Sequence, residues 1–467
     1  MPVIHWFRRD LRVTDNTALS AACKDSGEVV TVYIASEWSR LHRWTGASRQ
    51  EFLCGCLDSL AKKIEIIGGR LIIRRGRAAE ELEKLMVETK AGALYFNRDP
   101  DPFGRQVEQQ VEQIAEKNGV KIRRFKDVAI HEQEEILTAT GGAYRVFTAY
   151  SRAWMKAEKL LAQGPVCKLS TPAGIKSLPL PVLADWNLHS TAKIPEQGER
   201  AARKRLAEFL RGPVLAYGAK RDNPAGCTTS RLSIDLRHGT ISIREIYEQC
   251  VRLSKEVTAV ERESIRKFIN ELIWREFYMQ ILWHYPEVLD VEFNPKHRSL
   301  KWREPGEDFQ RWCQGETGFP IVDAGMRQLN ATGFMHNRLR MITAMFLTKD
   351  LHIDWRHGER YFMERLVDGE IASNNGGWQW SAGTGADAAP YFRIQNPWAQ
   401  AARFDPEAAY IKEWVPELRE IDAAKLLRPP QAGMRIAKNY PTPMVDHARE
   451  RDVTLKMFAS LASASHG

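Results

Sequence analysis

Carboxylate, guanidinium and aromatic side chains recur at helical spacing between residues 266 and 278. Spacings of three and four place Glu271, Trp274, Arg275 and Tyr278 on adjoining parts of one helix surface. Aromatic rings can stack on an exposed base while a carboxylate hydrogen-bonds its polar edge, as expected where a nucleotide is flipped from a duplex. The same residues fit an ordinary Glu271–Arg275 helix pair beside buried aromatics. The spacing alone leaves both interpretations open.

A second group of polar residues carries hydroxyls. Four Ser and Thr side chains lie within residues 228–233, after Pro224 and Gly226, so a turn delivers hydroxyls and backbone N–H groups to the start of a helix. That arrangement suits a diphosphate, and it also suits a simple helix cap.

A third group combines arginines, amides and glycines. Arg338 and Arg340 lie two residues apart on a predicted helix, so one can reach a phosphate while the other turns inward. An inward Arg340 needs a carboxylate, and Asp368 is the natural partner because an unpaired buried charge is costly. Residues 373–380 add amides and glycines that allow a planar ligand to approach the backbone closely.

The elements that must position these groups differ along the chain. β-branched runs at 3–7, 29–34, 71–74, 93–97 and 120–125 alternate with amphipathic helical segments. This alternation predicts a doubly wound parallel sheet whose ligands bind outside the carboxyl ends of the strands. No GxGxxG fingerprint is present, which favours a scaffold or an accessory-ligand domain.

Three segments follow from this pattern. We predict an α/β domain over residues 1–130, a proline-punctuated connector over 131–200 and an all-α domain over 201–467. The clearest long helices are expected at 263–283 and 336–350.

Composition narrows the class of partner. The formal net charge of +9 favours a polyanionic partner such as nucleic acid, although a basic enzyme of another kind has the same balance. No apolar run approaches the ~20 residues of a membrane span, and no Cys/His cluster has metal-ligand spacing, so we expect neither a membrane nor a metal site.

Five ordered motifs resemble the photolyase/cryptochrome family. They are Trp-Phe-Arg-Arg-Asp-Leu-Arg at 6–12, Thr-Ser-Arg-Leu-Ser at 229–233, Trp-Arg-Glu-Phe-Tyr at 274–278, His-Asn-Arg-Leu-Arg-Met at 336–341 and Asn-Asn-Gly-Gly-Trp-Gln-Trp at 374–380. The resemblance is nearest to bacterial class I cyclobutane pyrimidine dimer photolyases. It implies an α/β antenna domain followed by an all-α domain that binds FAD. It also implies a carbon–carbon lyase, in which excited reduced FAD passes an electron to a flipped-out dimer and splits it.

The resemblance assigns a role to each matching position. Asn374 would face flavin N5, Glu271 would hydrogen-bond the dimer, and Met341 would pack against the lesion. The residues implied in FAD binding are Tyr217, Thr229, Ser230, Arg231, Leu232, Ser233, Phe268, Glu271, Arg340, Asp368, Gly369, Glu370 and Asn374. The residues implied in DNA binding are Arg221, Glu271, Trp274, Arg275, Tyr278, Asn337, Arg338, Met341, Trp380 and Gln400.

The resemblance also implies an electron relay of Trp302, Trp355 and Trp378, which would pass electrons to photoexcited oxidised flavin. Asn337 and Met341 stand where six-four photolyases have histidines, which favours cyclobutane dimers. Three positions depart from the commonest bacterial pattern and should alter FAD affinity more than the reaction: Phe268, Arg231 and Glu370.

The antenna is left open. Residues 97–105 lack the Asn-Glu pair of folate-binding members, so methenyltetrahydrofolate, a hydroxydeazaflavin and an empty antenna site all remain candidates. The expected protein is a cytoplasmic, nucleoid-associated bacterial monomer acting on UV-damaged DNA. The alternatives are a cryptochrome-type blue-light receptor and a thermally driven FAD oxidoreductase. Retention of Glu271, Trp274 and Met341 favours the repair enzyme over the receptor.

Overall fold

The structure is a computed structural model that describes residues 1–36, 45–226, 228–388, 390 and 392–464. Contacts divide the chain into two compact units. Unit 1 comprises Met1–Ser190, Pro195–Gly218 and Ser230–His284, and unit 2 comprises Thr191–Ile194, Ala219–Thr229 and Tyr285–Gly467. This grouping by contacts is not the predicted division at residues 130 and 200, which stays a prediction.

Unit 1 contains the expected parallel sheet. Its strands are β1 (Val3–Phe7), β2 (Val29–Ala35), β3 (Leu71–Arg75), β4 (Ala93–Asn97) and β5 (Lys121–Phe125). All four strand pairs are parallel, in the order β3-β2-β1-β4-β5. The doubly wound α/β fold is therefore confirmed, with its topological switch point between β1 and β4.

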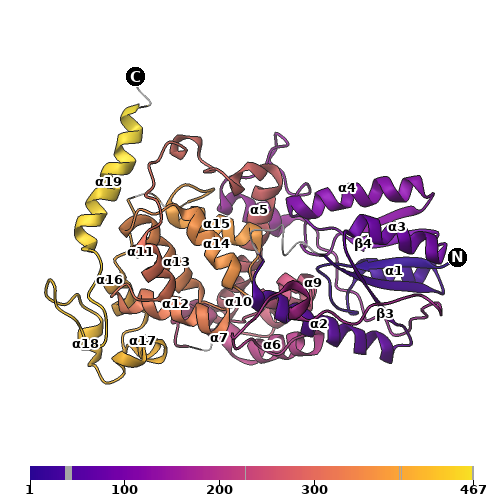
Figure 1. Cartoon of the computed structure of the whole chain (residues 1–467), viewed down its shortest axis with the longest axis horizontal. Helices are drawn as coiled ribbons and strands as arrows, with labels where there is room; N and C mark the ends of the chain where they lie inside the picture. The colour runs from indigo at the N-terminus through magenta and orange to yellow at the C-terminus, as the bar shows by residue number, and fades with distance from the viewer. Residues whose placement is uncertain (37–44, 227, 389, 391, 465–467) are drawn as a thin grey trace. The chain divides into compact units, whose positions relative to one another are not determined.

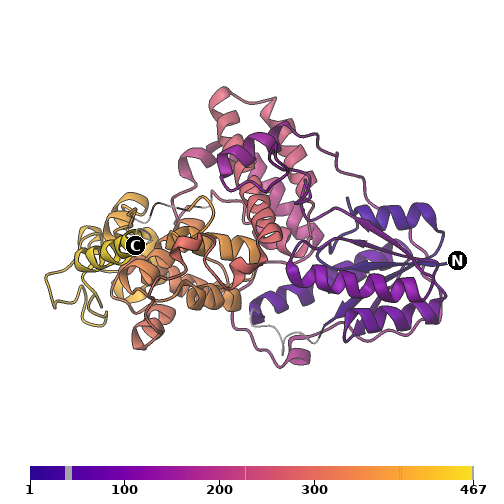
Figure 2. The same ribbon diagram turned by 90° about the horizontal axis from the view of Figure 1, so that it is seen from above.

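Helices cover both faces of this sheet (Figure 2). Because successive side chains of a strand point to opposite faces, Ile4 and Trp6 of β1 join one buried cluster, which also contains Leu82 and Val111. The helices around the strands are α1 (Thr17–Asp25), α2 (Ala47–Ile66), α3 (Ala78–Thr89) and α4 (Pro102–Lys117).

The switch point is filled by side chains of the protein itself. Asn97, at the end of β4, donates to Asp10 Oδ2 at 2.7 Å and to Asn16 Oδ1 at 2.8 Å. Burial raises the pKa of Asp10. This network anchors the first motif, at 6–12, to the sheet, so its role here is structural.

The rest of unit 1 contains helices and long irregular segments, as at 126–146 and 157–182. Its elements are α5 (Phe147–Lys156), η2 (Leu183–Trp186), α6 (Glu199–Arg211), most of α7 (Pro213–Lys220), α8 (Ser233–His238), α9 (Ile243–Ser254) and α10 (Ala259–His284). The expected helix at 263–283 is confirmed as the central part of α10.

Unit 2 consists of helices around one large apolar core (Figure 1). They are η3 (Pro286–Leu289), η4 (Pro295–His297), α11 (Glu307–Gln314), α12 (Pro320–Thr332), α13 (Asn337–Met345), η5 (Phe346–Asp350), α14 (Trp355–Arg365), α15 (Ile371–Ala382), α16 (Pro397–Phe404), α17 (Ala409–Trp414), η6 (Pro416–Leu418), α18 (Ala423–Leu426) and α19 (His447–Ala464). Among the described residues, no helix is long and apolar enough to cross a membrane.

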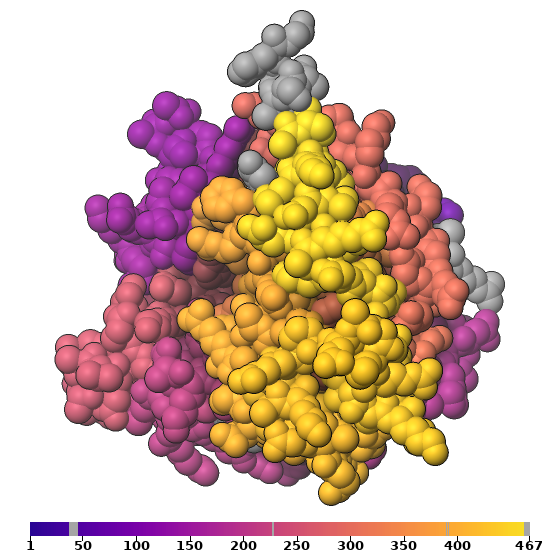
Figure 3. Space-filling view, turned by 90° about the vertical axis from the view of Figure 1, so that its left-hand side faces the viewer, coloured from indigo at the N-terminus to yellow at the C-terminus, as the bar shows by residue number. Residues whose placement is uncertain are grey.

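The predicted single helix at 336–350 needs correction. His336 is an N-cap, α13 ends at Met345, and residues 346–350 continue as the π-helix η5. Every residue of η5 is buried, including Lys349 and Asp350. The C-terminal helix α19, the yellow ridge in Figure 3, contacts this segment: Thr454 Oγ1 donates to Lys349 O at 2.6 Å, and His447 Nδ1 lies 2.6 Å from Asp350 Oδ1. Contacts with α19 therefore accompany the change of helix type.

Candidate active site

Helix α10 carries a partly exposed strip of polar and aromatic side chains. Glu271, Trp274, Arg275 and Tyr278 are all half-buried, whereas the α10 side chains that alternate with them are buried, as at 272–273 and 276–277. The predicted grouping of these four residues on one surface is present. Between 268 and 282 most side chains of α10 are buried, so the strip that stays accessible presents the aromatic and carboxylate groups together.

Trp274 is held by other aromatic rings of unit 1. Phe147, the first residue of α5, stacks on its indole with ring centroids 3.7 Å apart and an interplanar angle of 5°. Phe277 meets Trp274 edge-on at 5.5 Å, and the Tyr278 ring is 5.4 Å away. Stacking and edge contacts of this kind fix the orientation of a ring. One face of Trp274 is therefore covered by the protein.

The neighbouring charged residues of α10 serve the fold. Arg275 donates from Nη1 to the carbonyl of Val128 at 2.7 Å and from Nη2 to the carbonyl of Leu236 at 3.4 Å. Glu276 Oε2 accepts from Trp154 Nε1 at 2.6 Å, and burial raises the Glu276 pKa. Arg275 therefore has backbone partners in the protein, and its predicted DNA contact stays a prediction.

Other residues of the implied FAD set in unit 1 lie on α7, α8 and α10. Tyr217 and Phe268 are buried, and their rings meet edge-on at 5.5 Å. Residues 230–233 lead into α8, which begins at Ser233, as the sequence predicts, and Ser230 Oγ accepts from Leu232 N at 3.3 Å. Arg231 is exposed and has a left-handed backbone with φ of 53°.

In unit 2 the predicted ion pair between Arg340 and Asp368 is present. Arg340 Nη2 donates to both carboxylate oxygens, at 2.8 Å and 3.1 Å, and Arg340 Nε donates to Met335 O at 2.8 Å. The Asp368 side chain is 2% exposed and that of Arg340 is 26% exposed. The guanidinium thus spans from a buried carboxylate to an accessible edge.

Helix α15, which packs against α13, has a partly exposed strip. The strip contains Ser373, Asn374, Gly377 and Trp380. Asn374 Nδ2 donates to Glu359 O at 3.0 Å, which orients the amide with Oδ1 as its acceptor. A Cβ added at Gly377 would meet nothing within 4 Å, so the backbone there borders open space. This strip can accept a flat ligand at close range.

Gly369 and Glu370 precede α15 and are buried. Glu370 Oε2 accepts from Ser373 Oγ at 3.1 Å, which ties the start of the helix to its first turn.

The residues implied in phosphate and lesion contacts lie mainly on α13. Asn337 is exposed, and Arg338, Met341 and Gln400 are half-buried. Arg338 Nη2 donates to Asp222 at 2.8 Å, and its guanidinium carbon lies 4.3 Å from the Phe404 ring centroid. As predicted, Arg338 and Arg340 have different partners. Arg221 and Thr229 are half-buried in the same unit.

The three tryptophans that the resemblance assigns to an electron relay lie in unit 2. The indole nitrogens of Trp302 and Trp355 both donate to Glu292 Oε1, at 3.3 Å and 3.2 Å. Trp378 lies against Gly358, because a Cβ added there would be 2.1 Å from its Cη2. Gly358 is one helical turn beyond Trp355 on α14. The structure therefore brings the three indoles into one region, from a half-buried Trp302 to a buried Trp378.

Comparisons with known proteins match this arrangement over the whole chain. Residues 3–170 match the DNA photolyase model, and residues 268–460 match the FAD binding domain of DNA photolyase. A deoxyribodipyrimidine photo-lyase of Agrobacterium fabrum is 37% identical over 98% of each chain. That of Escherichia coli K12 is 37% identical over 97% of each chain. The chain belongs to the DNA photolyase family.

Solved structures agree with this assignment. A bacterial class III photolyase from Agrobacterium tumefaciens superimposes with a TM-score of 0.92 at 37% identity, covering 99% of this chain and 98% of that one. An archaeal photolyase from Sulfolobus tokodaii, described with two FAD molecules, superimposes with a TM-score of 0.86 at 30% identity. The match covers 98% of this chain and 100% of that one. A Synechocystis cryptochrome superimposes with a TM-score of 0.88 at 28% identity. The match covers 98% of this chain and 99% of that one.

The described side chains fit the FAD of this photolyase family. The open space beside Gly377 permits close approach of a ring system. Asn374 and Arg340 offer an oriented amide and a partly accessible cation next to it in the fold, since α13 and α15 pack together. These groups suit a planar, hydrogen-bonding cofactor that carries phosphates.

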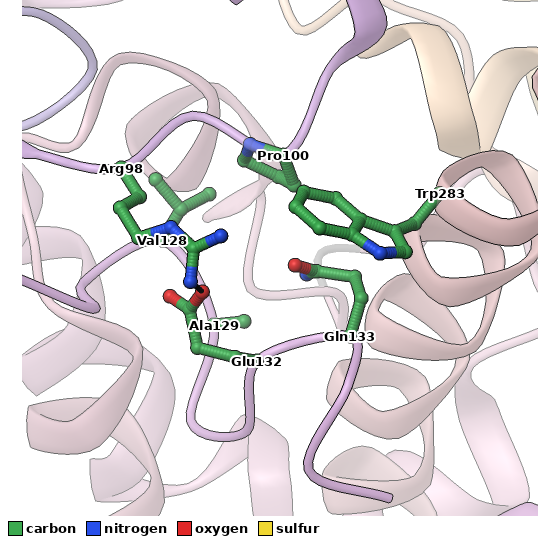
Figure 4. Close-up of a pocket in the computed structure, with 7 residues that line it drawn as sticks. All are labelled: Arg98, Pro100, Val128, Ala129, Glu132, Gln133 and Trp283. Carbon is green, nitrogen blue, oxygen red and sulfur yellow. Dashed lines mark ion pairs between the residues drawn. The ribbon is translucent and has the colours of Figure 1, made fainter. Parts of the chain in front are cut away.

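A small pocket of the photolyase α/β region lies at the carboxyl end of β4 (Figure 4). Its volume is about 10 Å³, and it is lined by Arg98, Pro100, Val128, Ala129, Glu132, Gln133 and Trp283. Arg98 pairs with Glu132 at 2.7 Å, and burial raises the pKa of Glu132 to about 7. The Arg105 guanidinium lies 3.7 Å from the Trp283 ring centroid. This space accommodates a water-sized group rather than a chromophore ring.

Sequence reasoning missed three residues that contact predicted site residues of this photolyase-family chain. Phe147 stacks on Trp274, and Glu292 joins two relay indoles, but both are far in sequence from the residues they contact. His336 was given no role of its own, yet its Nδ1 accepts from Arg338 N at 3.1 Å and caps α13. Of the three, only His336 had a sequence signal, namely its position at the start of the predicted helix over 336–350.

Proposed function

We propose that this photolyase-family protein is a deoxyribodipyrimidine photolyase, which repairs cyclobutane pyrimidine dimers in DNA by light-driven electron transfer. The observation that carries the proposal is the accessible strip on α10, where Glu271 and Trp274 lie on one surface of the part at 268–282, whose other side chains are mostly buried. Bound, reduced FAD supplies the excited electron that opens the dimer, with no net redox change.

The strip on α10 would receive the flipped lesion. Trp274, supported from behind by Phe147, presents a rigid aromatic surface to a base, and Trp380 of α15 would supply a second one. Glu271 would hydrogen-bond the polar edge of the dimer and stabilise the charge that develops there. Met341 would add an apolar contact, and Tyr278 would extend the aromatic surface.

A second set of residues would hold the cofactor and the DNA backbone. Asn374 donates from Nδ2 to Glu359 O, so its Oδ1 would stay available to accept a hydrogen bond from a protonated flavin nitrogen. Arg340 would place its charge beside the ring while Asp368 holds its orientation. Phosphate contacts would come from Arg221, Asn337, Arg338 and Gln400, and contacts to FAD from Tyr217, Phe268, Gly369, Glu370 and residues 229–233.

The working form would be a monomer in the bacterial cytoplasm, associated with the nucleoid. This part of the proposal follows from the substrate, since the lesion lies in chromosomal DNA. Relatives named as deoxyribodipyrimidine photo-lyases occur in bacteria such as Escherichia coli and Vibrio cholerae.

The test is a repair assay on holoenzyme that has been chemically reduced, so that photoactivation is bypassed. The protein is illuminated with an oligonucleotide containing a thymine dimer, and the return of thymine absorbance is followed. We expect light-dependent repair, lowered about tenfold or more in Glu271→Ala because a charge-stabilising contact to the reacting group is lost.

The matched control is Glu263→Gln on the same helix. Glu263 pairs with Arg266 on an exposed surface, at 2.7 Å, so the substitution should leave repair unchanged. If the bound flavin photoreduces but wild-type protein repairs nothing, the enzyme proposal fails and a cryptochrome-type light receptor is the better account.

A further inference from the structure

Glu292 occupies an unusual position between two tryptophans. Its side chain is buried, at 4% exposure, and lies in the segment between η3 and η4. Oε1 accepts hydrogen bonds from both Trp302 and Trp355, and Oε2 accepts from Arg356 Nη2 at 3.0 Å. Arg298 Nε donates to its backbone carbonyl at 3.0 Å. A neutral oxygen could accept a hydrogen bond from either indole, so the fold does not require a buried carboxylate that both indoles share.

Glu292 is held in its ionised form. Burial opposes ionisation, but the hydrogen bonds and charge of Arg356 outweigh burial and keep the Glu292 pKa below its usual range. A fixed negative charge therefore lies within hydrogen-bond distance of two indole N–H groups.

The charged groups in contact with the indole rings differ from Trp378 to Trp355 to Trp302. An indole that loses an electron becomes a cation, which a carboxylate at hydrogen-bond distance stabilises. Trp302 and Trp355 have this contact. Trp378 does not share it, and its Nε1 has no hydrogen-bond partner among the described residues. The Arg356 guanidinium lies 4.7 Å from the Trp355 ring centroid, and this cation disfavours a positive charge on Trp355.

These charges favour movement of a positive charge outward along the relay. From these contacts the electron vacancy is least stable on Trp378, more stable on Trp355, and most stable on Trp302, which has the carboxylate and, among the described residues, no cation over its ring. Helices α14 and α15, which carry Trp355 and Trp378, lie side by side (Figure 1). The inner and middle indoles are thus held on packed helices while the outer one is half-buried.

We propose that Glu292 is the charge partner and proton acceptor of the tryptophan relay. When Trp302 gives up one electron toward photoexcited oxidised flavin, its Nε1 proton passes to Glu292 Oε1 along the existing hydrogen bond, which leaves a neutral indole radical and a protonated carboxyl. A soluble thiolate then gives one electron to the indole radical and becomes a thiyl radical, and Glu292 returns the proton to Nε1. The proposal rests on the proposed function only in assuming that the relay serves the flavin.

The direct test is time-resolved infrared and visible spectroscopy of oxidised holoenzyme after a light flash, with a thiol present. In wild-type protein, the carboxyl band of a protonated glutamic acid should appear as the indole cation signal converts to that of the neutral radical. In Glu292→Gln, which keeps the shape and an acceptor oxygen but not the charge, the band should be absent. The yield of the long-lived radical should also fall about tenfold.

The matched control is Glu287→Gln, an exposed carboxylate of η3 in the same connection, which should behave as wild type. The proposal is overturned if wild-type protein shows no carboxyl band during indole proton loss, or if Glu292→Gln gives the same radical yield and decay. The wild-type measurement decides the question even where the variant does not fold. Absence of dimer repair by chemically reduced wild-type protein would instead count against the proposed function and leave the Glu292 result standing.

Discussion

Arg340 and Asp368 show how one pair of residues links stability to cofactor binding. Asp368 is almost completely buried, and its two oxygens accept from the same guanidinium nitrogen. Removing one partner of such a pair leaves a buried charge without compensation, which costs more than the pair itself contributes. The other edge of the guanidinium is accessible, so the residue also presents charge outward.

Arg340→Met should lower the free energy of unfolding by about 2 to 3 kcal/mol, because Asp368 would remain buried without its cation. The same variant should purify with less FAD. Denaturant unfolding followed by circular dichroism gives the first quantity, and the ratio of flavin to protein absorbance gives the second.

The double variant Arg340→Met/Asp368→Leu separates the two effects. Replacing both charges by apolar groups should recover most of the lost stability. It should not restore FAD content, because the cation toward the cofactor is still missing. Recovery of both stability and flavin would show that Arg340 acts only as a partner for Asp368.

At the scale of an element, α13 depends on the protonation state of its cap. His336 Nδ1 accepts from the backbone N–H of Arg338, which requires that this nitrogen carry no proton. Burial lowers the pKa of His336 to about 4, below its usual 6.5. Between these two values the unfolded chain binds a proton that the folded protein excludes, so stability from this group falls as the pH falls from 6.5 toward 4.

The free energy of unfolding should therefore decrease more steeply between pH 7 and pH 5 in wild-type protein than in His336→Asn. The difference expected from His336 is about 2 kcal/mol. Asn is a good N-cap that does not titrate, so the two proteins should be similar at pH 7. Urea unfolding at the two pH values checks this. Parallel pH profiles would mean that His336 does not titrate with folding.

Helices and strands were predictable where the local sequence pattern determines them. The five strands followed from β-branched runs, and α10 followed from its periodicity, because burial on a sheet or a helix face imposes those repeats. The π-helix at 346–350 was not predictable. It occurs together with contacts such as that of Lys349 O with Thr454, more than a hundred residues away in the chain, which have no local sequence signal.

The candidate site divides in the same way. Glu271, Trp274 and Tyr278 were grouped correctly because helical spacing alone puts them on one face. The roles of Phe147 and Glu292 arise from packing between segments that the sequence separates, and neither has a local pattern. Arg340 and Asp368 could be paired because a buried charge demands a partner, which limits the choice strongly.

At the scale of the whole molecule, the net charge of +9 governs how the protein meets DNA. Each Lys or Arg that neutralises a phosphate releases a condensed counterion, so affinity should fall as salt rises. The proposed contacts to the flipped dimer are stacking and hydrogen bonds, which would release few ions. Salt should thus weaken binding to damaged and undamaged duplexes almost equally, and the ratio of the two affinities should change little.

Arg338→Gln should reduce the slope of the logarithm of the DNA association constant against the logarithm of the salt concentration by about one for both duplexes. Arg338 reaches Asp222 in the free protein, at 2.8 Å, so a phosphate would have to displace that carboxylate or share the guanidinium with it. The measurement is fluorescence anisotropy of labelled duplexes, with and without a thymine dimer, over a range of salt concentrations.

Arg123→Gln provides the matched charge change, because Arg123 lies on β5 with a side chain 60% exposed. If net charge alone determined affinity, this variant would change the slope as much as Arg338→Gln does. If instead Arg338 makes a specific phosphate contact, only its substitution lowers the slope, and Arg123→Gln binds like wild type. Equal slopes for wild type and both variants would show that Arg338 makes no phosphate contact. The proposed lesion contacts of α10 would then be tested separately.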